Sequence, residues 1–171
     1  MKIAIASLIS VTALCACASH FAGPVASAQL QPTKGNSVAG WARFSQQGDK
    51  VLVAGEVTGL APNTEHGFHI HDKGDCSSGD GMSTGGHFNP DGKPHGSHEA
   101  AEHHAGDLKS LQADAHGVAK FQYETGALSV GSGLRDVVGH GLIVHRDADD
   151  LKTQPTGNSG PRVACAVITK N

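Results

Sequence analysis

The sequence predicts an all-β fold, a Greek-key β-sandwich or flattened barrel of about eight antiparallel strands with two long functional loops. Short segments with apolar residues at alternate positions indicate strands that bury one face. Clusters of glycine, asparagine, aspartate and proline stand between them and favour turns. The chain has 171 residues, of which 23 are glycines and 4% are aromatic, and this composition suits one domain of short strands better than a helical one.

The expected strands begin with a hairpin. Val38 to Phe44 alternates in polarity, turn residues follow at 46–49, and 51–57 returns as the second strand. The remaining strands are expected at residues 66–71, 107–113, 118–123, 137–145 and 162–169. The segments 72–107 and 146–160 are rich in turn residues and show no sustained periodicity, so they are expected to form the two long loops.

The N-terminal residues 1–28 have the pattern of an export signal. Lys2 precedes an apolar run over residues 3–18 that is short for a membrane span, and Ala26-Ser27-Ala28 matches an A-x-A cleavage site before Gln29. An alternative is a lipoprotein signal of residues 1–16, because Leu14-Cys15-Ala16-Cys17 resembles a lipobox that would leave Cys17 lipidated as a membrane anchor. Both interpretations predict an exported protein.

The domain is expected to start shortly after this signal. Residues 29–36 are polar with one proline and are expected to be a flexible N-terminal segment, so that the folded domain spans 37–171. The formal net charge of the chain is −3. Because a phosphate-binding surface needs an excess of basic residues, nucleic acid is not an expected partner.

Cysteine usage points to one disulfide. Of the four cysteines, two lie in the leader and Cys76 and Cys165 remain. An exported chain with two cysteines suggests that they pair, closing a loop of about 90 residues that contributes about 4–5 kcal/mol in the chain-entropy model. The alternative is a pair of free buried thiols.

A histidine-rich stretch begins at His69 and His71. Residues two apart on a strand point to the same face, about 7 Å apart, so these imidazoles could form half of a metal site; the alternative is two solvent-facing histidines. Further candidate ligands are His87, His95, His104, Asp107 and His145. Two four-ligand sites follow if one residue is shared: four imidazoles suit Cu(II), and three imidazoles with one carboxylate suit Zn(II).

Several segments together resemble the motifs of the Cu,Zn superoxide dismutase family. The metal-binding motifs are Gly67-Phe68-His69-Ile70-His71, Gly86-His87-Phe88-Asn89-Pro90, His104-Ala105-Gly106-Asp107 and Gly141-Leu142-Ile143-Val144-His145. The segment 157–165 resembles the family's C-terminal arginine–cysteine segment, and Gly74-Asp75-Cys76 resembles the exported bacterial, periplasmic branch. The resemblance covers Val38 to Thr169.

The resemblance implies a role for each candidate residue. The implied sites are copper on His69, His71, His87 and His145, and zinc on His87, His95, His104 and Asp107, with one Cu and one Zn ion per subunit. Cys76 would pair with Cys165. Arg162 would attract and orient superoxide, with Thr156 opposite it at the channel rim. Asp149 would link a copper histidine to a zinc histidine.

The implied activity is superoxide dismutation, as antioxidant defence in the periplasm. Copper would alternate between Cu(II) and Cu(I), yielding dioxygen and then hydrogen peroxide, with His87 as the proton carrier and zinc in a structural role. The alternative is an exported copper or zinc buffer or metallochaperone on the same fold, which the complete ligand set and Arg162 disfavour. The resemblance leaves open whether the chain forms a homodimer.

Other conspicuous side chains are expected to lie outside the two sites. His98 and His103 are interpreted as surface histidines rather than as a third metal site. His66 is interpreted as structural, and Met82 as a packing residue of the loop rather than a copper ligand.

Overall fold

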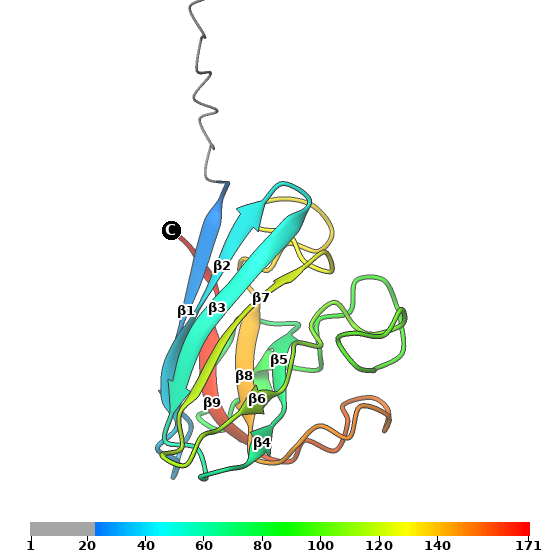
Figure 1. Cartoon of the computed structure of the whole chain (residues 1–171). Coiled ribbons are helices and arrows are strands. Elements are labelled where there is room, and N and C mark those ends of the chain that lie inside the picture. The colour runs from blue at the N-terminus through cyan, green and yellow to red at the C-terminus, as the bar shows by residue number, and fades with distance from the viewer. Residues whose placement is uncertain (1–22) are drawn as a thin grey trace, which may run out of the picture.

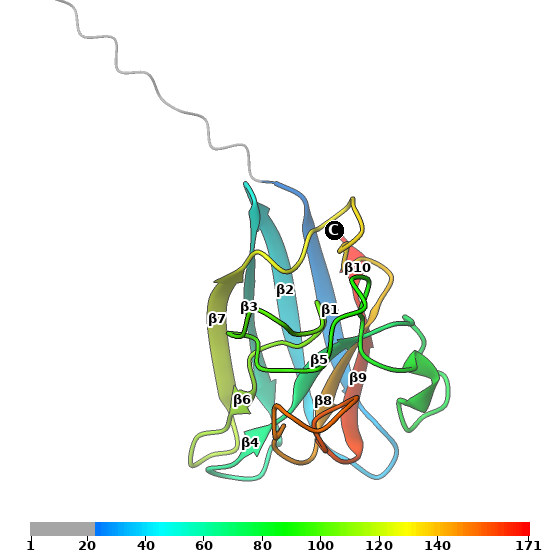
Figure 2. The same cartoon turned by 90° about the vertical axis from the view of Figure 1, so that its right-hand side faces the viewer.

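The computed structural model describes residues 23–171, which fold into one curled antiparallel sheet and a small second sheet (Figures 1 and 2). The strands are β1 (Val25–Pro32), β2 (Ala39–Gln47), β3 (Lys50–Thr58), β4 (Glu65–His66), β5 (Phe68–His71), β6 (Leu111–Gln112), β7 (Ala119–Thr125), β8 (Gly141–His145), β9 (Arg162–Val167) and β10 (Thr169–Lys170). One short 3₁₀ helix, η1, covers Met82–Thr84. The predicted all-β fold is confirmed.

The large sheet has the strand order β5-β8-β9-β1-β2-β3-β7, with β10 paired to β1, and β4 pairs with β6 in the small sheet. All pairs of named strands are antiparallel. The predicted first hairpin is confirmed, since β2 and β3 pair in the large sheet from Ala39↔Thr58 to Gln47↔Lys50. Within the described residues, no helix is long and apolar enough to cross a membrane.

Alternating burial along the strands builds the core. In β3, the alternate residues Val51, Val53, Gly55 and Val57 are buried, while the residues between them are partly exposed. Because successive strand residues point to opposite faces, this pattern places one apolar face of the sheet inside the curl. Phe44 and Phe68 fill the interior. In contrast, β5 and β8 are buried on both faces, so their histidines enter the protein interior.

The first strand corrects the predicted domain boundary. Residues 29–36 were expected to be flexible, but Gln29–Pro32 belongs to β1, which begins at Val25 and pairs with β2 along most of its length. Ala26 and Ala28 are buried in the core. In Ala26-Ser27-Ala28 the two alanines point into the core and the serine points outward, as in a strand. The same three small residues also match a cleavage site, so the sequence alone does not distinguish the two. The lipobox and the apolar run lie outside the described residues.

Two other predicted strands are shorter than expected. The strand expected at 107–113 is reduced to β6, which pairs with β4. The strand expected at 137–145 begins only at Gly141, after Gly139 adopts a left-handed φ of 86° that interrupts the extended chain.

The two predicted long loops are present and lie on the same side of the molecule. The segment 72–107 contains only η1 and isolated bridges, and 146–160 contains no regular element. Figure 1 shows both segments, green and orange, beside β5 and β8 and away from β1–β3. The disulfide between Cys76 and Cys165 ties the first loop to β9, which confirms the predicted pairing.

Candidate metal centre

The first cluster of histidines is assembled on the edge of the large sheet. His69 and His71 come from β5, and His145 ends the neighbouring strand β8. His87 reaches the same place from the long loop through a bridge that pairs it with His71. The ligand atoms of these four side chains lie within 4.8 Å of one another, and all four residues are buried. The structure thus brings together the predicted four-imidazole set.

The second cluster is centred on the carboxylate of Asp107. Its Oδ1 lies 2.8 Å from Nδ1 of His87, 3.0 Å from Nδ1 of His95 and 3.3 Å from Nδ1 of His104. Its Oδ2 accepts backbone N–H groups of Gly96 and His104 at 3.1 and 2.9 Å. Although burial raises the pKa of this carboxyl, the hydrogen bonds from the three histidines hold it well below its usual range. This is the predicted set of three imidazoles and one carboxylate.

His87 belongs to both clusters and turns a different nitrogen toward each. Its Nδ1 faces Asp107, and its Nε2 is buried without a hydrogen-bond partner. Nδ1 of His69 is likewise buried without a partner, and Nε2 of His145 lies 3.4 Å from Nε2 of His71. Buried nitrogens are rarely left unpaired because their desolvation is costly. Converging bare nitrogens are therefore what a metal site requires of its ligands.

Backbone carbonyls fix which nitrogen of the other rings faces the cluster. Nδ1 of His71 donates to the carbonyl of Gly85 at 2.9 Å, and Nδ1 of His145 donates to that of Gly160 at 3.1 Å. These bonds leave Nε2 of both rings as the unprotonated, metal-binding atom. Burial also lowers the pKa of His145 to about 3 and that of His87 to about 4, so both rings are neutral at physiological pH, as ligation demands.

Asp149 connects the two clusters, as predicted. One carboxylate oxygen lies 2.7 Å from Nε2 of His69, and the other lies 2.9 Å from Nε2 of His95. Burial raises the pKa of Asp149, but the hydrogen bonds from both rings lower it below its usual value. The carboxylate thereby orients one ring of each cluster, with Nδ1 of each ring turned inward. With four imidazoles in one cluster and three plus a carboxylate in the other, the side chains fit copper and zinc.

Comparison with known proteins agrees with this geometry. Residues 38–168 match the family model for copper/zinc superoxide dismutase. The chain belongs to this family. It is accordingly an oxidoreductase that acts on superoxide and uses copper and zinc.

Named relatives cover most of the chain. It is 38% identical over 137 residues to the Cu-Zn superoxide dismutase of Paramecium bursaria Chlorella virus 1, covering 77% of this chain and 72% of that protein. It is 44% identical over 138 residues to Cu-Zn superoxide dismutase 2 of Brassica juncea, covering 77% and 89%. The crystal structure of the clock protein EA4 superposes with a TM-score of 0.77 at 39% identity, covering 85% of this chain and 93% of that one.

Arg162 of this dismutase lies next to the first cluster, because it pairs with His145 across β8 and β9. Its guanidinium donates to the carbonyls of Gly81 and Gly85 at 2.6 and 2.7 Å and to Oγ1 of Thr84 at 2.7 Å. Among the described residues it has no carboxylate partner within ion-pairing distance, so its charge is not cancelled by a contact. Partial burial lowers its pKa, and Asp80 opposes that shift.

The other predicted rim residue, Thr156, is half-buried in the 146–160 loop, where its carbonyl accepts Oγ of Ser159 at 3.4 Å. Over the described residues its side chain makes no hydrogen bond to either cluster. His98 and His103 are not members of either cluster, but they are part-buried rather than surface side chains, and Nδ1 of His98 donates to the backbone carbonyl of Asp107 at 3.0 Å. Met82 is exposed and is not part of either cluster.

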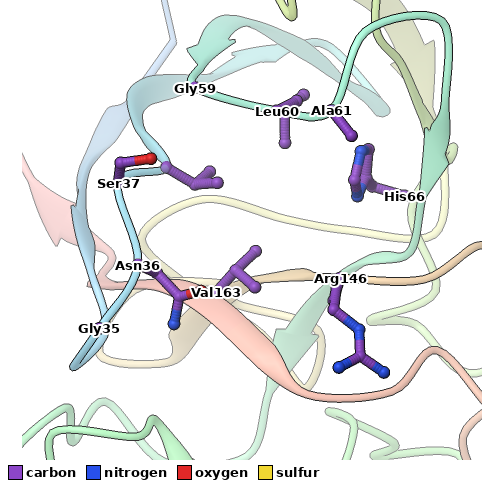
Figure 3. A pocket seen from close by; sticks show the side chains of 10 residues that line it. Gly35, Asn36, Ser37, Gly59, Leu60, Ala61, His66, Arg146 and Val163 are labelled. Carbon is purple, nitrogen blue, oxygen red and sulfur yellow. The ribbon is translucent and has the colours of Figure 1, made fainter.

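Two supporting residues were not predicted to touch the site. His66 donates from Nδ1 to the carbonyl of His145 at 3.0 Å, and Gln154 bonds to the backbone of His95. His66 also lines a cavity of about 360 Å³ with Leu60, Arg146 and other residues (Figure 3). None of the residues of the two clusters lines this cavity.

Proposed function

We propose that the two clusters are the working metal sites of this dismutase: copper is held by His69, His71, His87 and His145, and zinc by His87, His95, His104 and Asp107. The observation that carries this assignment is the pair of buried nitrogens without partners, Nδ1 of His69 and Nε2 of His87. Bound copper supplies the one-electron redox chemistry by which one superoxide is oxidised to dioxygen and a second is reduced to hydrogen peroxide.

The remaining side chains bind the substrate anion and supply a proton. Arg162 attracts and orients superoxide, and three oxygen acceptors hold its guanidinium in place without neutralising it. Thr156 forms the opposite rim of the entrance. Nε2 of His87 holds a proton only when it is not bound to copper, because Nδ1 stays engaged on the Asp107 side. Asp107 keeps that ring oriented through its contact with Nδ1.

The decisive test is superoxide decay after pulse radiolysis, using protein loaded with copper and zinc. The wild type should accelerate decay strongly. Arg162→Ile should slow it by about tenfold or more with metal content unchanged, because local positive charge raises the encounter rate of an anion. Arg43→Ile, a change on the far strand β2, is the matched control. Two bound metals without acceleration would leave the alternative function, a copper or zinc buffer on the same fold.

We infer further that the protein is exported to the periplasm, as its leader predicts, and is processed at Cys17 rather than after Ala28. Support comes from β1, because cleavage after Ala28 would remove four residues of a strand that pairs with β2 and β10. Processing before Cys17 leaves this strand intact. Gly74-Asp75-Cys76 also resembles the exported bacterial branch.

Mass spectrometry of the mature N-terminus tests this second proposal. Lipidation at Cys17 predicts an acylated peptide that disappears in Cys17→Ser and persists in Cys15→Ser. A mature chain that starts at Gln29 would contradict processing at Cys17 and would support cleavage after Ala28.

A further inference from the structure

The backbone of His95 depends on a single side chain. His95 lies in the long 72–107 loop, where no strand supplies hydrogen bonds to it, and it is only 3% exposed. Its N–H donates to Oε1 of Gln154 at 2.8 Å, and its carbonyl accepts Nε2 of Gln154 at 2.9 Å. In the part of the chain that the structure describes, neither backbone group has another partner. One amide side chain thus satisfies both polar groups, as a neighbouring strand would.

Gln154 is itself held by its own loop. Its Nε2 also donates to the carbonyl of Lys152 at 3.1 Å. The turn around it is braced by Asp150, which accepts the N–H groups of Lys152 and Thr153 and the hydroxyl of Thr153. The amide is therefore presented to His95 from a fixed turn rather than from a free side chain, although Gln154 lies at the surface.

Two further residues of the 146–160 loop, Asp149 and Gly157, contact the ring of His95. Asp149 bonds to Nε2 of the His95 ring, and Gly157 packs so closely that a side chain there would meet the same nitrogen. Thus the ring is held by Asp149, the backbone by Gln154, and the intervening space is closed by Gly157. The remaining ring nitrogen, Nδ1, faces Asp107 in the second cluster.

We infer that Gln154 is a positioning residue for zinc, which fixes the backbone of His95 and couples zinc binding to the order of the 146–160 loop. This inference rests on the proposed assignment of His95 as a zinc ligand. Without the two hydrogen bonds from Gln154, the buried N–H and carbonyl of His95 are unpaired. The resulting free-energy cost destabilises the conformation in which Nδ1 of His95 faces the second cluster. Zinc affinity therefore falls even though no ligand is changed.

The test measures zinc affinity directly. Metal-free protein is titrated with Zn²⁺ in competition with a chromophoric chelator, for the wild type, Gln154→Ala, Gln154→Glu and the control Gln122→Ala, whose glutamine is exposed on β7. Gln154→Ala should weaken zinc binding about tenfold, as loss of an outer partner does in other metal sites. Gln154→Glu should lie between, because it still accepts the His95 N–H but cannot donate to the carbonyl.

A spectroscopic readout separates positioning from a general loss of stability. Co²⁺ placed in the zinc site should give altered d–d bands in Gln154→Ala and unaltered bands in Gln122→Ala. Unchanged zinc affinity and an unchanged cobalt spectrum in folded Gln154→Ala would overturn the inference. His95→Ala keeps the two proposals distinct. If His95→Ala still binds zinc with wild-type affinity, the ligand assignment fails. If His95→Ala loses zinc while Gln154→Ala binds it as the wild type does, only the positioning role of Gln154 is refuted.

Discussion

Asp149 shows how one residue connects the two clusters without belonging to either. Its two oxygens hold Nε2 of His69 and Nε2 of His95, so its replacement affects both clusters. Asp149→Asn keeps the size but turns one oxygen into an N–H donor that meets a ring N–H. We expect zinc affinity to fall about 10- to 100-fold. Chelator competition measures this, with Asp147→Asn in the same loop as control; equal affinities would show that the bridge does not orient His95.

Gly157 is a position where any side chain meets the site. Its φ is +66°, and a Cβ would overlap Oδ1 of Asp149 and Nε2 of His95. Gly157→Ala should lower the free energy of unfolding and also weaken zinc binding.

The matched control is Gly48→Ala, at a φ of +61° with open space around it. This variant isolates the cost of a left-handed backbone, about 1–2 kcal/mol. Urea unfolding and zinc titration of both variants check the prediction. A Gly157→Ala protein that behaves like Gly48→Ala in both measurements would contradict the contact.

The ligands were predictable from the sequence, whereas most of the side chains that support them were not. His69 and His71 stand out because a strand imposes a two-residue period, and the remaining ligands follow from motif resemblance. Gln154 and His66 act on the backbone of a ligand rather than on the metal, so no ligand spacing marks them. Asp149 was predicted only because the motif around it is similar to that of the family.

At the scale of elements, the strand β1 was not predicted, because Ala26-Ser27-Ala28 matches a cleavage site as well as it matches a strand of small alternating residues. A chain beginning at Gln29 loses the pairs Val25↔Ser45 to Ala28↔Ala42. With two buried alanine methyls and a few ladder hydrogen bonds removed, we expect it to be about 3 kcal/mol less stable than a chain beginning at Gly23. Urea unfolding of both metal-loaded chains measures the difference. Equal stability would show that the first half of β1 is dispensable.

The disulfide joins an irregular loop to a strand. Cys76 and Cys165 are 89 residues apart, and the loop between them includes every residue of the second cluster. The double variant Cys76→Ser, Cys165→Ser should lose about 4–5 kcal/mol, because the unfolded chain regains its loop entropy. Urea unfolding tests this, with reductant-treated wild type as a second route to the same state. A loss below about 1 kcal/mol in both would show that the metals alone secure the loop.

The molecule as a whole divides into a regular sheet and an irregular face that carries most of the cluster residues. β1, β2, β3 and β7 hold one another by continuous ladders and an apolar core. His87, His95, His104 and Asp107 come instead from a segment with almost no regular structure. Binding energy at such ligands is folding energy for the segment that carries them.

Metal removal should therefore loosen one face of the molecule rather than all of it. In hydrogen exchange, amides of residues 85–107 and 149–160 should exchange at least about tenfold faster in metal-free protein, since bound metal at 1,000 times its dissociation constant contributes about 4 kcal/mol. Amides of β2, β3 and β7 should change little, because their partners lie within the sheet.

Adding zinc alone should restore most of the protection in both loops, as Asp149 and Gln154 link the second loop to His95. Uniformly faster exchange would mean that the sheet also depends on the metals. Protection restored only in residues 85–107 would mean that the two loops respond independently.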